Sequence, residues 1–422
     1  MNEPGINSQT SCMDDFDPQS LAADTALHRI LGAINPLSAT ECVVVRQALD
    51  RVLATDLISG MDVPAHTNSA MDGYALAASD LPAAGTRELK VAGTALAGKP
   101  YPQALTPGHC VRIMTGAVLP DAADTVIIQE NVTVEGDHIR IGTDTQPGAN
   151  VRQAGEDIAA GDTVLTRGTR LTPADLGLVA SLGISEIAVA RKPRIAFFST
   201  GDELQSVGEE LAIGNVYDSN RYTLHGMLSR LNAEIIDLGV VRDNRADLEA
   251  AFHEASAQAD MVITSGGVSV GEADYVREIL SRLGQVNFWK VAIKPGRPLA
   301  FGNIGPAIFF GLPGNPVSVM VTFYQFVQPA ILKLMGARHV QPVTVRAICN
   351  SKLKKRAGRV EYQRGIVELN ADNRLVVSKT GAQGSGILTS MAQANCFIIL
   401  PMESTGVQPG DDVDIQLFFG LV

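Results

Sequence analysis

Between residues 190 and 336, short apolar runs alternate with amphipathic segments, and only a few folds are compatible with this alternation. Five runs rich in Val, Ile and Phe are typical of buried strands, and the segments between most of them have helical spacing. Such a chain forms a largely parallel sheet covered by helices on both faces, with ligands bound at the carboxyl ends of the strands. The five runs are RIAFFSTGDEL, AEIIDLGVV, DMVITSGG, QVNFWKVAI and AIFFGLPG.

The chain on either side of this segment has other patterns. Residues 20–34 and 171–184 have helical spacing, and a further helix is predicted at 39–53. From about 86 to 170, and again from about 342 to the end, short alternating runs between Gly, Pro, Asp and Asn predict β structure. A chain of 422 residues is too long for one ordinary core, so several domains are expected.

Composition argues against several classes of function. A formal charge of -11 and a pI near 5.2 do not suit a nucleic-acid surface, which is basic as a rule. Five scattered cysteines without a CxxC pair and seven histidines without HExxH predict neither a disulfide framework nor a zinc site. Any metal would be a hard cation on oxygen ligands. The first 20 residues have neither a basic nor an apolar block, and no stretch is apolar enough for a membrane span, so we expect a cytoplasmic protein.

Three of the predicted strands end in loops rich in turn-forming residues, at 199–203, 265–271 and 312–316. In the stretch TSGGVSVGEADY, residues 264–275, glycines let backbone N–H groups approach a phosphate, and the following helix N-terminus favours an anion. A tight turn in which one of the loop's own side chains caps the helix explains the same residues equally well. Three such loops on one sheet edge would converge on one pocket, which favours binding.

Several carboxylates follow the strand ends or begin a helix near these loops, namely Asp202, Glu203, Asp243 and Asp274. Acidic residues in a first helical turn are also favoured by the helix dipole, which is a sufficient explanation for Glu272. Carboxylates that face a phosphate need a hard cation between them. Asp274 is therefore a candidate Mg2+ ligand.

The sharpest local signal is the run KVAIKPGRP, which starts at Lys290. Lys290 and Lys294 are four residues apart in a predicted strand, so both can project from one face. A solvated strand edge is the usual explanation for such lysines. Because the prolines on both sides of Arg297 stiffen the turn and so aim the cations, we favour an anion clamp. The next loop offers a second anion site, with Asn315 as a helix cap and the hydroxyl of Ser318.

Polar residues outside the α/β segment carry little information alone. Asp72 and Thr115 lie in polar turns within apolar surroundings. The run KLKKRAGR, residues 352–359, is predicted to be a solvated basic loop, whereas Arg364 and Ser385 lie in predicted turns that could face another domain. A role for these residues can be assigned only when the motifs of the whole chain are considered together.

The motifs, in their order, closely resemble those of the molybdopterin molybdenumtransferase family, the bacterial MoeA proteins, which are similar to the C-terminal part of gephyrin. They run across nearly the whole chain, so the resemblance is far more specific than any single motif. The matching stretches are NSAMDGYA (68–75), RIMTGA (112–117), GEDI (155–158), STGDEL (199–204), TSGGVSVGEADY (264–275), WKVAIKPGRP (289–298), GLPGNPVS (311–318), EYQRG (361–365) and TGAQGSG (380–386).

The resemblance implies a multidomain α/β and β fold. Its parts are a disordered arm, an elongated dimerisation domain, an inserted β domain, an α/β molybdopterin-binding domain with a mostly parallel sheet, and a C-terminal β barrel. It also implies a homodimer, with the active cleft between the α/β domain of one subunit and the N-terminal half of the other. The implied bounds are 1–19 for the arm, 20–60 with 145–190 for the elongated domain, 61–144 for the inserted domain, 191–340 for the α/β domain and 341–422 for the barrel.

The family reaction takes adenylylated molybdopterin and molybdate, inserts molybdenum at the dithiolene and releases AMP with Mg2+ present. Molybdate and a phosphoanhydride are both negatively charged, so cations must neutralise them before they can meet. By resemblance, the catalytic residues are Asp274, Lys290 and Lys294; molybdate is held by Lys294, Arg297, Ser318, Arg364 and Ser385; the pterin and nucleotide by Asp72, Thr115, Thr200, Glu203, Gly266, Gly267, Ser269, Pro313, Gly314 and Asn315; and Mg2+ by Asp274, Asp243 and Glu203.

One departure and two other interpretations remain open. Many family members have lysine where this chain has Arg297, whose planar fork could change the oxyanion geometry. Molybdopterin adenylyltransferases share the α/β domain and its loops, but they would not need the first 180 residues or the barrel. A gephyrin-like anchoring scaffold needs no chemistry, although no long linker or appended domain supports one here. Other proteins of molybdenum cofactor biosynthesis are further candidate partners.

Overall fold

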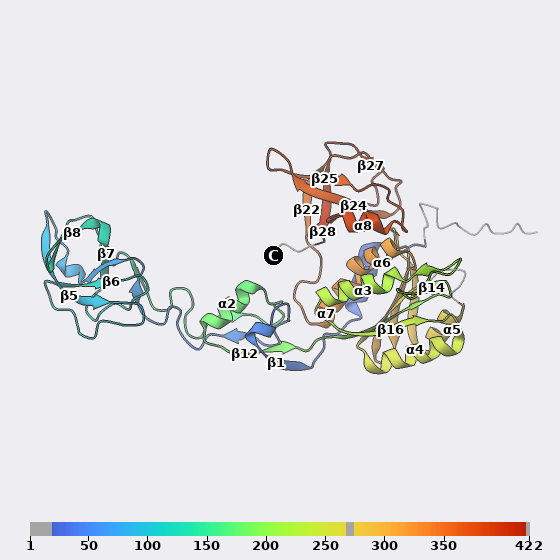
Figure 1. The fold of residues 1–422 in the computed structure, drawn as a ribbon, viewed down its shortest axis with the longest axis horizontal. Helices are drawn as coiled ribbons and strands as arrows, with labels where there is room; N and C mark the ends of the chain where they lie inside the picture. Colours follow the sequence, from blue (N-terminus) through green and yellow to red (C-terminus); the bar gives the residue numbers. More distant parts are fainter. Residues whose placement is uncertain (1–18, 267–273, 419–422) are drawn as a thin grey trace, which may run out of the picture.

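The computed structural model describes residues 19–266 and 274–418. The predicted disordered arm, residues 1–19, lies outside the described residues except for its last position. The described chain forms an elongated molecule, with a β unit at one end and an α/β unit beside a barrel at the other (Figure 1). The predicted multidomain α/β and β fold is confirmed, while the residue bounds given above for its domains stay predictions.

The α/β unit is built on a six-stranded sheet with the order β16-β13-β17-β21-β20-β18. The first four strands are parallel, and β20 is antiparallel to both of its neighbours. The predicted mostly parallel sheet is confirmed, but β20 was not predicted, because it begins at Pro298 within a stretch that has the composition of a turn. The strands are β13 (Arg194–Thr200), β16 (Glu234–Val241), β17 (Met261–Ser265), β18 (Gly284–Lys290), β20 (Pro298–Ile304) and β21 (Ala307–Leu312), with the short pair β14 (Leu204–Gln205) and β15 (Val216–Tyr217) after β13.

Helices cover both faces of this sheet, because successive side chains of a strand point to opposite faces. Phe197 packs in one core with α1, α3, α6 and α7, and its neighbour Phe198 packs in a second core with α4 and α5. Each face therefore has its own apolar layer. The helices are α1 (Ala23–Gly32), α3 (Ser219–Arg230), α4 (Arg245–Gln258), α5 (Asp274–Leu283), α6 (Pro316–Thr322) and α7 (Gln328–Leu334), with the π-helical turn η4 (Phe323–Val327) between the last two.

One described helical run, Pro316–Leu334, is long and apolar enough by composition to cross a membrane. However, 78% of its 18-residue window is buried inside the protein. It comprises α6, η4 and α7, whose side chains pack against α1 and the sheet. It is therefore a helix of the α/β core.

A ladder of short antiparallel strand pairs leads from the α/β unit to the β unit, as Figure 1 shows. The helix predicted at 39–53 is wrong, because its first half is a strand that pairs with residues 186–190. Three consecutive valines, Val43 to Val45, favour the extended form, which a distant partner strand then stabilises. The pairs are β1 (Thr40–Val44) with β12 (Glu186–Ala190), β2 (Leu57–Ile58) with β11 (Thr163–Leu165), and β3 (Asn68–Ser69) with β10 (Val151–Arg152); η1 (Val45–Gln47) follows β1, and α2 (Pro173–Ser181) confirms the helix predicted at 171–184.

The β unit at the far end is a six-stranded sheet with the order β7-β4-β6-β5-β9-β8. Its core includes Tyr74, Val111 and Ile139 from three different strands. The β structure predicted for this region is confirmed. The elements are β4 (Gly73–Leu76), β5 (Arg87–Ala95), β6 (His109–Ile113), β7 (Thr125–Ile128), β8 (Val132–Glu135) and β9 (His138–Ile141), with the short helical turns η2 (Ala78–Asp80) and η3 (Gln129–Asn131).

The C-terminal unit is a closed five-stranded barrel, which confirms the predicted β barrel. Its strands follow the order β24-β25-β22-β28-β26, and β26 pairs back to β24. A sixth strand, β19, comes from the α/β unit and pairs in parallel with β24. The elements are β19 (Ile293–Lys294), β22 (Thr344–Cys349), β23 (Leu353–Lys354), β24 (Val360–Leu369), β25 (Leu375–Lys379), α8 (Leu388–Gln393), β26 (Cys396–Leu400), β27 (Gly406–Val407) and β28 (Asp412–Leu417).

Candidate functional site

The three predicted loops leave the sheet side by side. Ser199 of β13 is in register with Ser265 of β17, which is in register with Leu312 of β21. The loops after these strands therefore start at one edge of the sheet, as expected for parallel neighbours. The backbone N–H of Gly266 donates to the carbonyl oxygen of Leu312 at 3.1 Å, which ties two of the loops together.

Gly266 also brings the loop after β17 against the end of β13. Its φ of +94° lies in the left-handed region that favours glycine. A side-chain carbon built on Gly266 would lie 2.5 Å from the carbonyl oxygen of Thr200. Only glycine allows the backbone at this position to approach so closely, so the predicted site residues Thr200 and Gly266 are in contact.

Asn220 connects these loops, although it was not among the predicted site residues. It is the second residue of α3, whose N-cap is Asp218, and 8% of it is exposed. Its Nδ2 donates to Ser265 Oγ at 2.8 Å and to the carbonyl oxygen of Gly314 at 2.7 Å. The only sequence signal was a polar residue in the first turn of a helix after a strand, and that signal is common.

Four buried polar atoms at this sheet edge make no hydrogen bond within the described residues. Buried polar atoms in proteins almost always have a partner, so such a cluster is unusual in a sheet core. The cluster forms a polar floor at the carboxyl ends of β13 and β17, suited to hydrogen bonding with a polar ligand. The atoms are Ser199 Oγ, Thr200 Oγ1, Asn220 Oδ1 and Thr264 Oγ1.

Part of the predicted cradle cannot be placed. Gly267 and Ser269 lie outside the described residues, as does Glu272. Asp274 is the first residue of α5, and its side chain is also outside the described part of the chain. The predicted roles of these residues stay predictions.

The remaining predicted metal ligands lie near the same edge. Asp202 Oδ1 accepts a hydrogen bond from the backbone N–H of Asp243 at 3.2 Å, which brings the loops after β13 and β16 together. The carboxylate of Glu203 lies over Gly201. Among the side chains that the structure describes, no three or more His, Cys, Asp or Glu residues form a group that could hold a metal ion. A Mg2+ site therefore stays a prediction.

Lys290 and Lys294 do not share one strand, so the prediction that places them in one is wrong. Lys290 ends β18, whereas Lys294 belongs to β19 in the barrel sheet. The chain turns between them because Ala292 donates its N–H to the carbonyl oxygen of Leu21, near the start of the described chain. Lys294 forms an ion pair with Glu361 at 3.2 Å, and the Nη2 of Arg297 donates to Ser20 Oγ at 3.4 Å.

A barrel loop closes on the N-terminus of α6. The backbone N–H of Val317 donates to the carbonyl oxygen of Ser385 at 3.0 Å. Ser318, in the same helical turn, is 4% exposed. Asn315 occupies the predicted N-cap position, but its side chain makes no capping hydrogen bond and is exposed. The structure therefore brings together Ser385, Ser318 and the loop at Asn315, although they come from different units.

Arg364 forms hydrogen bonds with that barrel loop. The prediction that placed it in a turn is wrong. It lies in β24, and 1% of it is exposed. Its guanidinium donates to Ser390 Oγ at 3.0 Å and to the carbonyl oxygen of Gly384 at 3.1 Å. Burial lowers the pKa of Arg364 to about 10. These contacts fix the chain on both sides of Ser385.

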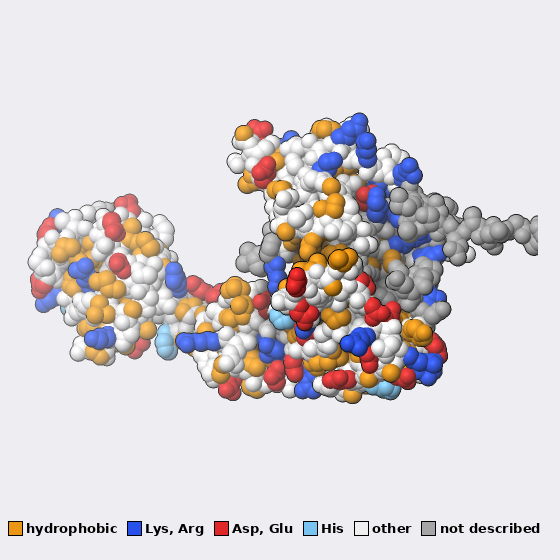
Figure 2. Space-filling model, turned by 45° about the vertical axis from the view of Figure 1, so that its right-hand side comes forward, with side chains coloured by type: hydrophobic (Ala, Val, Ile, Leu, Met, Phe, Trp, Pro, Cys, Tyr) orange, Lys and Arg blue, Asp and Glu red, His pale blue; other side chains and the backbone are white. Residues whose placement is uncertain are grey.

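The basic run at 352–359 is only partly solvated. Lys352, Lys354 and Arg356 are exposed, but Lys355 is 8% exposed. Its Nζ donates to three carbonyl oxygens of the barrel, including that of Met402. Figure 2 shows Lys and Arg side chains gathered along the right-hand side of the molecule, over the barrel and the α/β unit below it. Positive charge is thus concentrated locally on a protein of net negative charge.

Asp72 and Thr115 form a close pair in the β unit. The backbone N–H and the hydroxyl of Thr115 both donate to Asp72 Oδ1 at 2.7 Å. These two hydrogen bonds hold the pKa of the Asp72 carboxyl below its usual value, and nearby Arg112 adds to the effect. The β unit lies at the opposite end of the molecule from the barrel, so one chain does not bring this pair to the loops of the α/β unit (Figure 1).

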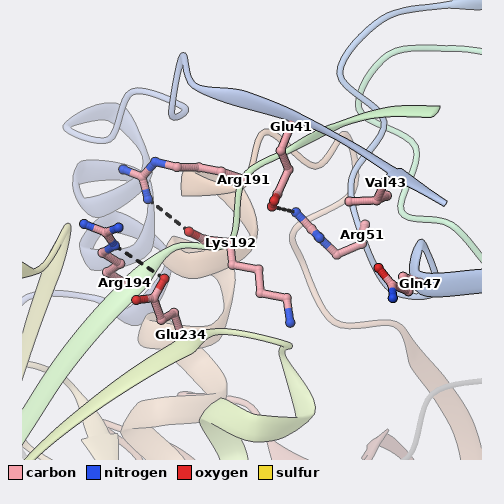
Figure 3. A pocket seen from close by; sticks show the side chains of 8 residues that line it. All are labelled: Glu41, Val43, Gln47, Arg51, Arg191, Lys192, Arg194 and Glu234. Carbon is pink, nitrogen blue, oxygen red and sulfur yellow. Dashed lines mark hydrogen bonds and ion pairs between the residues drawn. The ribbon is translucent and has the colours of Figure 1, made fainter. Parts of the chain in front are cut away.

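A cavity of about 490 Å3 lies elsewhere, where the chain passes from β12 into β13 (Figure 3). Several cations line it, but carboxylates pair with most of them. Arg51 pairs with Glu41, and Arg194 with Glu234, as the dashed lines in Figure 3 mark. Arg194 begins β13, so this cavity is at the opposite edge of the sheet from Thr200. It is separate from the predicted site.

Three family models match the chain in succession. The MoeA N-terminal region (domain I and II) matches residues 21–183, a probable molybdopterin binding domain matches 198–333, and the MoeA C-terminal region (domain IV) matches 346–418. Together they cover most of the chain and all of the units described above.

Individual proteins agree with these matches. A molybdopterin molybdenumtransferase of Haemophilus influenzae is 46% identical over 400 residues, which cover 94% of this chain and 98% of that protein. Gephyrin of Dictyostelium discoideum is 34% identical over 428 residues, covering 88% of this chain and 58% of gephyrin. The crystal structure of a molybdopterin biosynthesis moeA protein from Pyrococcus horikoshii superposes with a TM-score of 0.84 at 32% identity, covering 94% of this chain and 100% of that one.

Proposed function

The chain belongs to the MoeA family of molybdopterin molybdenumtransferases, and we propose that it inserts molybdenum from molybdate into adenylylated molybdopterin with release of AMP. Molybdate and the adenylylated pterin are then its substrates. The enzyme acts in molybdenum cofactor biosynthesis, and we expect it in the cytoplasm.

One observation supports this proposal above the others. The loops after β13, β17 and β21 start at one sheet edge, and a barrel loop joins them at the N-terminus of α6. Backbone N–H groups, buried hydroxyls and the ammonium of Lys294 belong to the elements that meet there. Donors of this kind suit two anionic substrates that must lie next to each other.

The two substrates divide the site between them. Molybdate would lie between the two units, near Lys294, Arg297, Ser318 and Ser385, with Arg364 holding the loop of Ser385 in place. The pterin phosphate and the nucleotide would lie along the edge at Thr200, Gly266, Pro313, Gly314 and Asn315, with Lys290 toward the phosphate.

Neutralisation of charge is the main catalytic contribution that we assign to this chain. A molybdate oxygen can approach the phosphorus of the phosphoanhydride only when the negative charge on both is compensated. Lysine and arginine side chains provide that compensation and keep their charge at neutral pH. The four cysteines that the structure describes are not needed as nucleophiles.

Mg2+ fits the donor chemistry of the same edge. Asp243, Glu203 and Asp274 offer carboxylate oxygens, which are the ligands that Mg2+ prefers. When bound, the ion would offset the charge of the phosphates. The proposed roles of these residues are to hold the ion and to keep the nucleotide side of the substrate in place.

The site requires two subunits. Asp72 and Thr115 are at the far end of the molecule, and we propose that they reach the cleft of a partner subunit in a homodimer. Exposed apolar side chains along the ladder and the β unit, such as Val44, Ile58 and Met71, would be covered in such a dimer. Other proteins of molybdenum cofactor biosynthesis would then supply the pterin.

The proposal is tested by the product. The purified protein is incubated with adenylylated molybdopterin, molybdate and Mg2+, and the mixture is added to a molybdenum enzyme freed of its cofactor. Activation of that enzyme is expected only when all components are present. Formation of adenylylated molybdopterin from molybdopterin and ATP, without activation of that enzyme, would instead indicate an adenylyltransferase. If neither reaction occurs, the scaffold interpretation is favoured.

A further inference from the structure

At the junction between the α/β unit and the barrel, the ammonium of Lys294 forms an ion pair with the carboxylate of Glu361. Lys294 and Glu361 are register partners in the parallel pair of β19 with β24, so their side chains leave the sheet on the same side. The Nζ of Lys294 lies 3.2 Å from Glu361 Oε1. The lysine side chain is 50% exposed and the glutamate side chain 9%. The ammonium therefore faces outward above a nearly buried carboxylate.

The carboxylate itself has a fixed position. Gln363, two residues further along β24 and on the same face, donates from Nε2 to Glu361 Oε1 at 3.2 Å. The same amide group lies 3.4 Å from the carbonyl oxygen of Lys354, and Gln363 is 4% exposed. Buried neighbours thus hold Glu361, and Glu361 in turn holds Lys294.

Glu361 also lies near two buried cations. Burial lowers the pKa of Lys355 and of Arg364, and the negative charge of Glu361 acts against both shifts. If Glu361 had a purely structural role, it would stabilise the fold through its charge interactions with Lys355 and Arg364. A role in the reaction would act through Lys294, so the two roles can be separated.

We propose that Glu361 is a positioning residue of the molybdate site, acting through Lys294. An ammonium has three donors and no acceptor, so one ion pair to Glu361 leaves two donors for an anion on the exposed side. Because a carboxylate repels a dianion, Glu361 does not increase the affinity for molybdate. Its contribution is to hold the ammonium where the reaction needs it. This inference rests on the proposed function.

The test compares Glu361→Gln with the wild-type protein in molybdate-dependent AMP release. The amide keeps the size of the side chain but loses its charge. We expect kcat to fall about 10- to 100-fold, as is usual when a catalytic group is misplaced by about 1 Å, while the KM for molybdate stays equal or falls. The matched control is Glu368→Gln, an exposed glutamate of the same strand, which should leave both constants unchanged.

A double-variant cycle identifies the residue through which Glu361 acts. In a Lys294→Ala background, Glu361→Gln should cause no further loss of kcat, because the group that it positions is already absent. An additive loss, or an unchanged kcat in the single variant, would overturn the positioning role. If thermal melting shows that Glu361→Gln is not folded, Glu361→Asp is measured instead, and the same changes in kcat and KM decide whether Glu361 has the positioning role. A wild-type protein without AMP release would overturn the proposed function itself, whereas an active wild type with a fully active variant would overturn only the role of Glu361.

Discussion

Lys294 is a residue of the fold to which the proposed reaction assigns a second role, in binding molybdate. It joins β19 to the barrel through Glu361, and half of its side chain stays exposed. The loops after β13, β17 and β21 contribute backbone N–H groups, hydroxyls and carboxylates, whereas Lys294 and Arg297 place positive charge where the two units meet. Removal of Lys294 should therefore affect molybdate more than the pterin.

We predict that Lys294→Ala raises the molybdate concentration for half-maximal rate about 10- to 100-fold. A hydrogen bond to a charged group contributes about 1.5 to 3 kcal/mol, and each 1.4 kcal/mol is tenfold in affinity. The measurement is a molybdate titration of AMP release at saturating pterin. Lys333→Ala, in α7 away from the loops, is the control. An unchanged molybdate dependence would remove Lys294 from the anion site.

Loss of Lys294 should also lower the melting temperature, because Glu361 would keep its charge in a nearly buried position with one partner fewer. The double variant Lys294→Ala with Glu361→Gln should recover part of this loss. If the wild-type protein and both variants have the same melting temperature, the ion pair does not contribute to stability.

At the scale of elements, the close approach of β17 to β13 depends on one glycine. Gly266 combines a left-handed φ with a contact that leaves no room for a side chain against Thr200. A larger residue would have to separate the two loops or strain the backbone. The spacing of the loops after β13 and β17 and the stability of the sheet edge are therefore linked.

We predict that Gly266→Ala lowers the free energy of unfolding by about 1 to 3 kcal/mol, the range for a strained backbone position. Gly314→Ala is the matched control on the adjacent loop, where an added carbon comes no closer than 4.0 Å to its nearest neighbour, Gly266 Cα. That change should stay within about 0.5 kcal/mol. Urea denaturation measures both. Equal stability of the two variants would show that the contact at Gly266 is not a constraint.

The elements also show what sequence patterns can and cannot predict. The parallel strands and their loops were predicted because buried runs and turn residues are local signals. The strand β1 was mistaken for a helix, since its partner β12 lies over 140 residues away. Lys290 and Lys294 were placed in one strand because the pairing of Ala292 with Leu21 leaves no trace in local spacing.

In the candidate site, too, local sequence signals could be predicted and long-range contacts could not. Glycines and charged residues in loops could be recognised individually, and the resemblance gave them roles. Asn220 and Glu361 were not predicted as candidate site residues, because what distinguishes them is only what they contact after folding. Arg364 was expected in a turn, but burial in β24 makes it a support for the loop of Ser385.

At the scale of the whole molecule, the elongated shape separates residues that the proposed reaction needs together. Asp72 and Thr115 are at one end and Lys294 is at the other (Figure 1). In a homodimer with each cleft shared between subunits, every site would take its β unit from one chain and its α/β unit from the other. This arrangement has a consequence that can be measured by mixing variants.

We predict that Asp72→Asn and Lys294→Ala complement each other in mixed dimers. Each homodimer should be strongly impaired, whereas a mixed dimer has one cleft with both changes and one with neither. Co-expression with two different tags isolates the mixed dimer, which should have about half of the wild-type activity. The control pairs Lys294→Ala with Arg297→Ala, both at the same junction, and should give no recovery. Recovery in the control, or none in the test pair, would contradict a shared cleft.

The most direct test of the proposed reaction is AMP release by the purified wild-type protein given adenylylated molybdopterin and Mg2+, with and without molybdate. We expect AMP to appear in step with the pterin consumed when molybdate is present, and its release to be slow or absent without molybdate. AMP release that does not depend on molybdate, or no release under either condition, would contradict the proposed reaction.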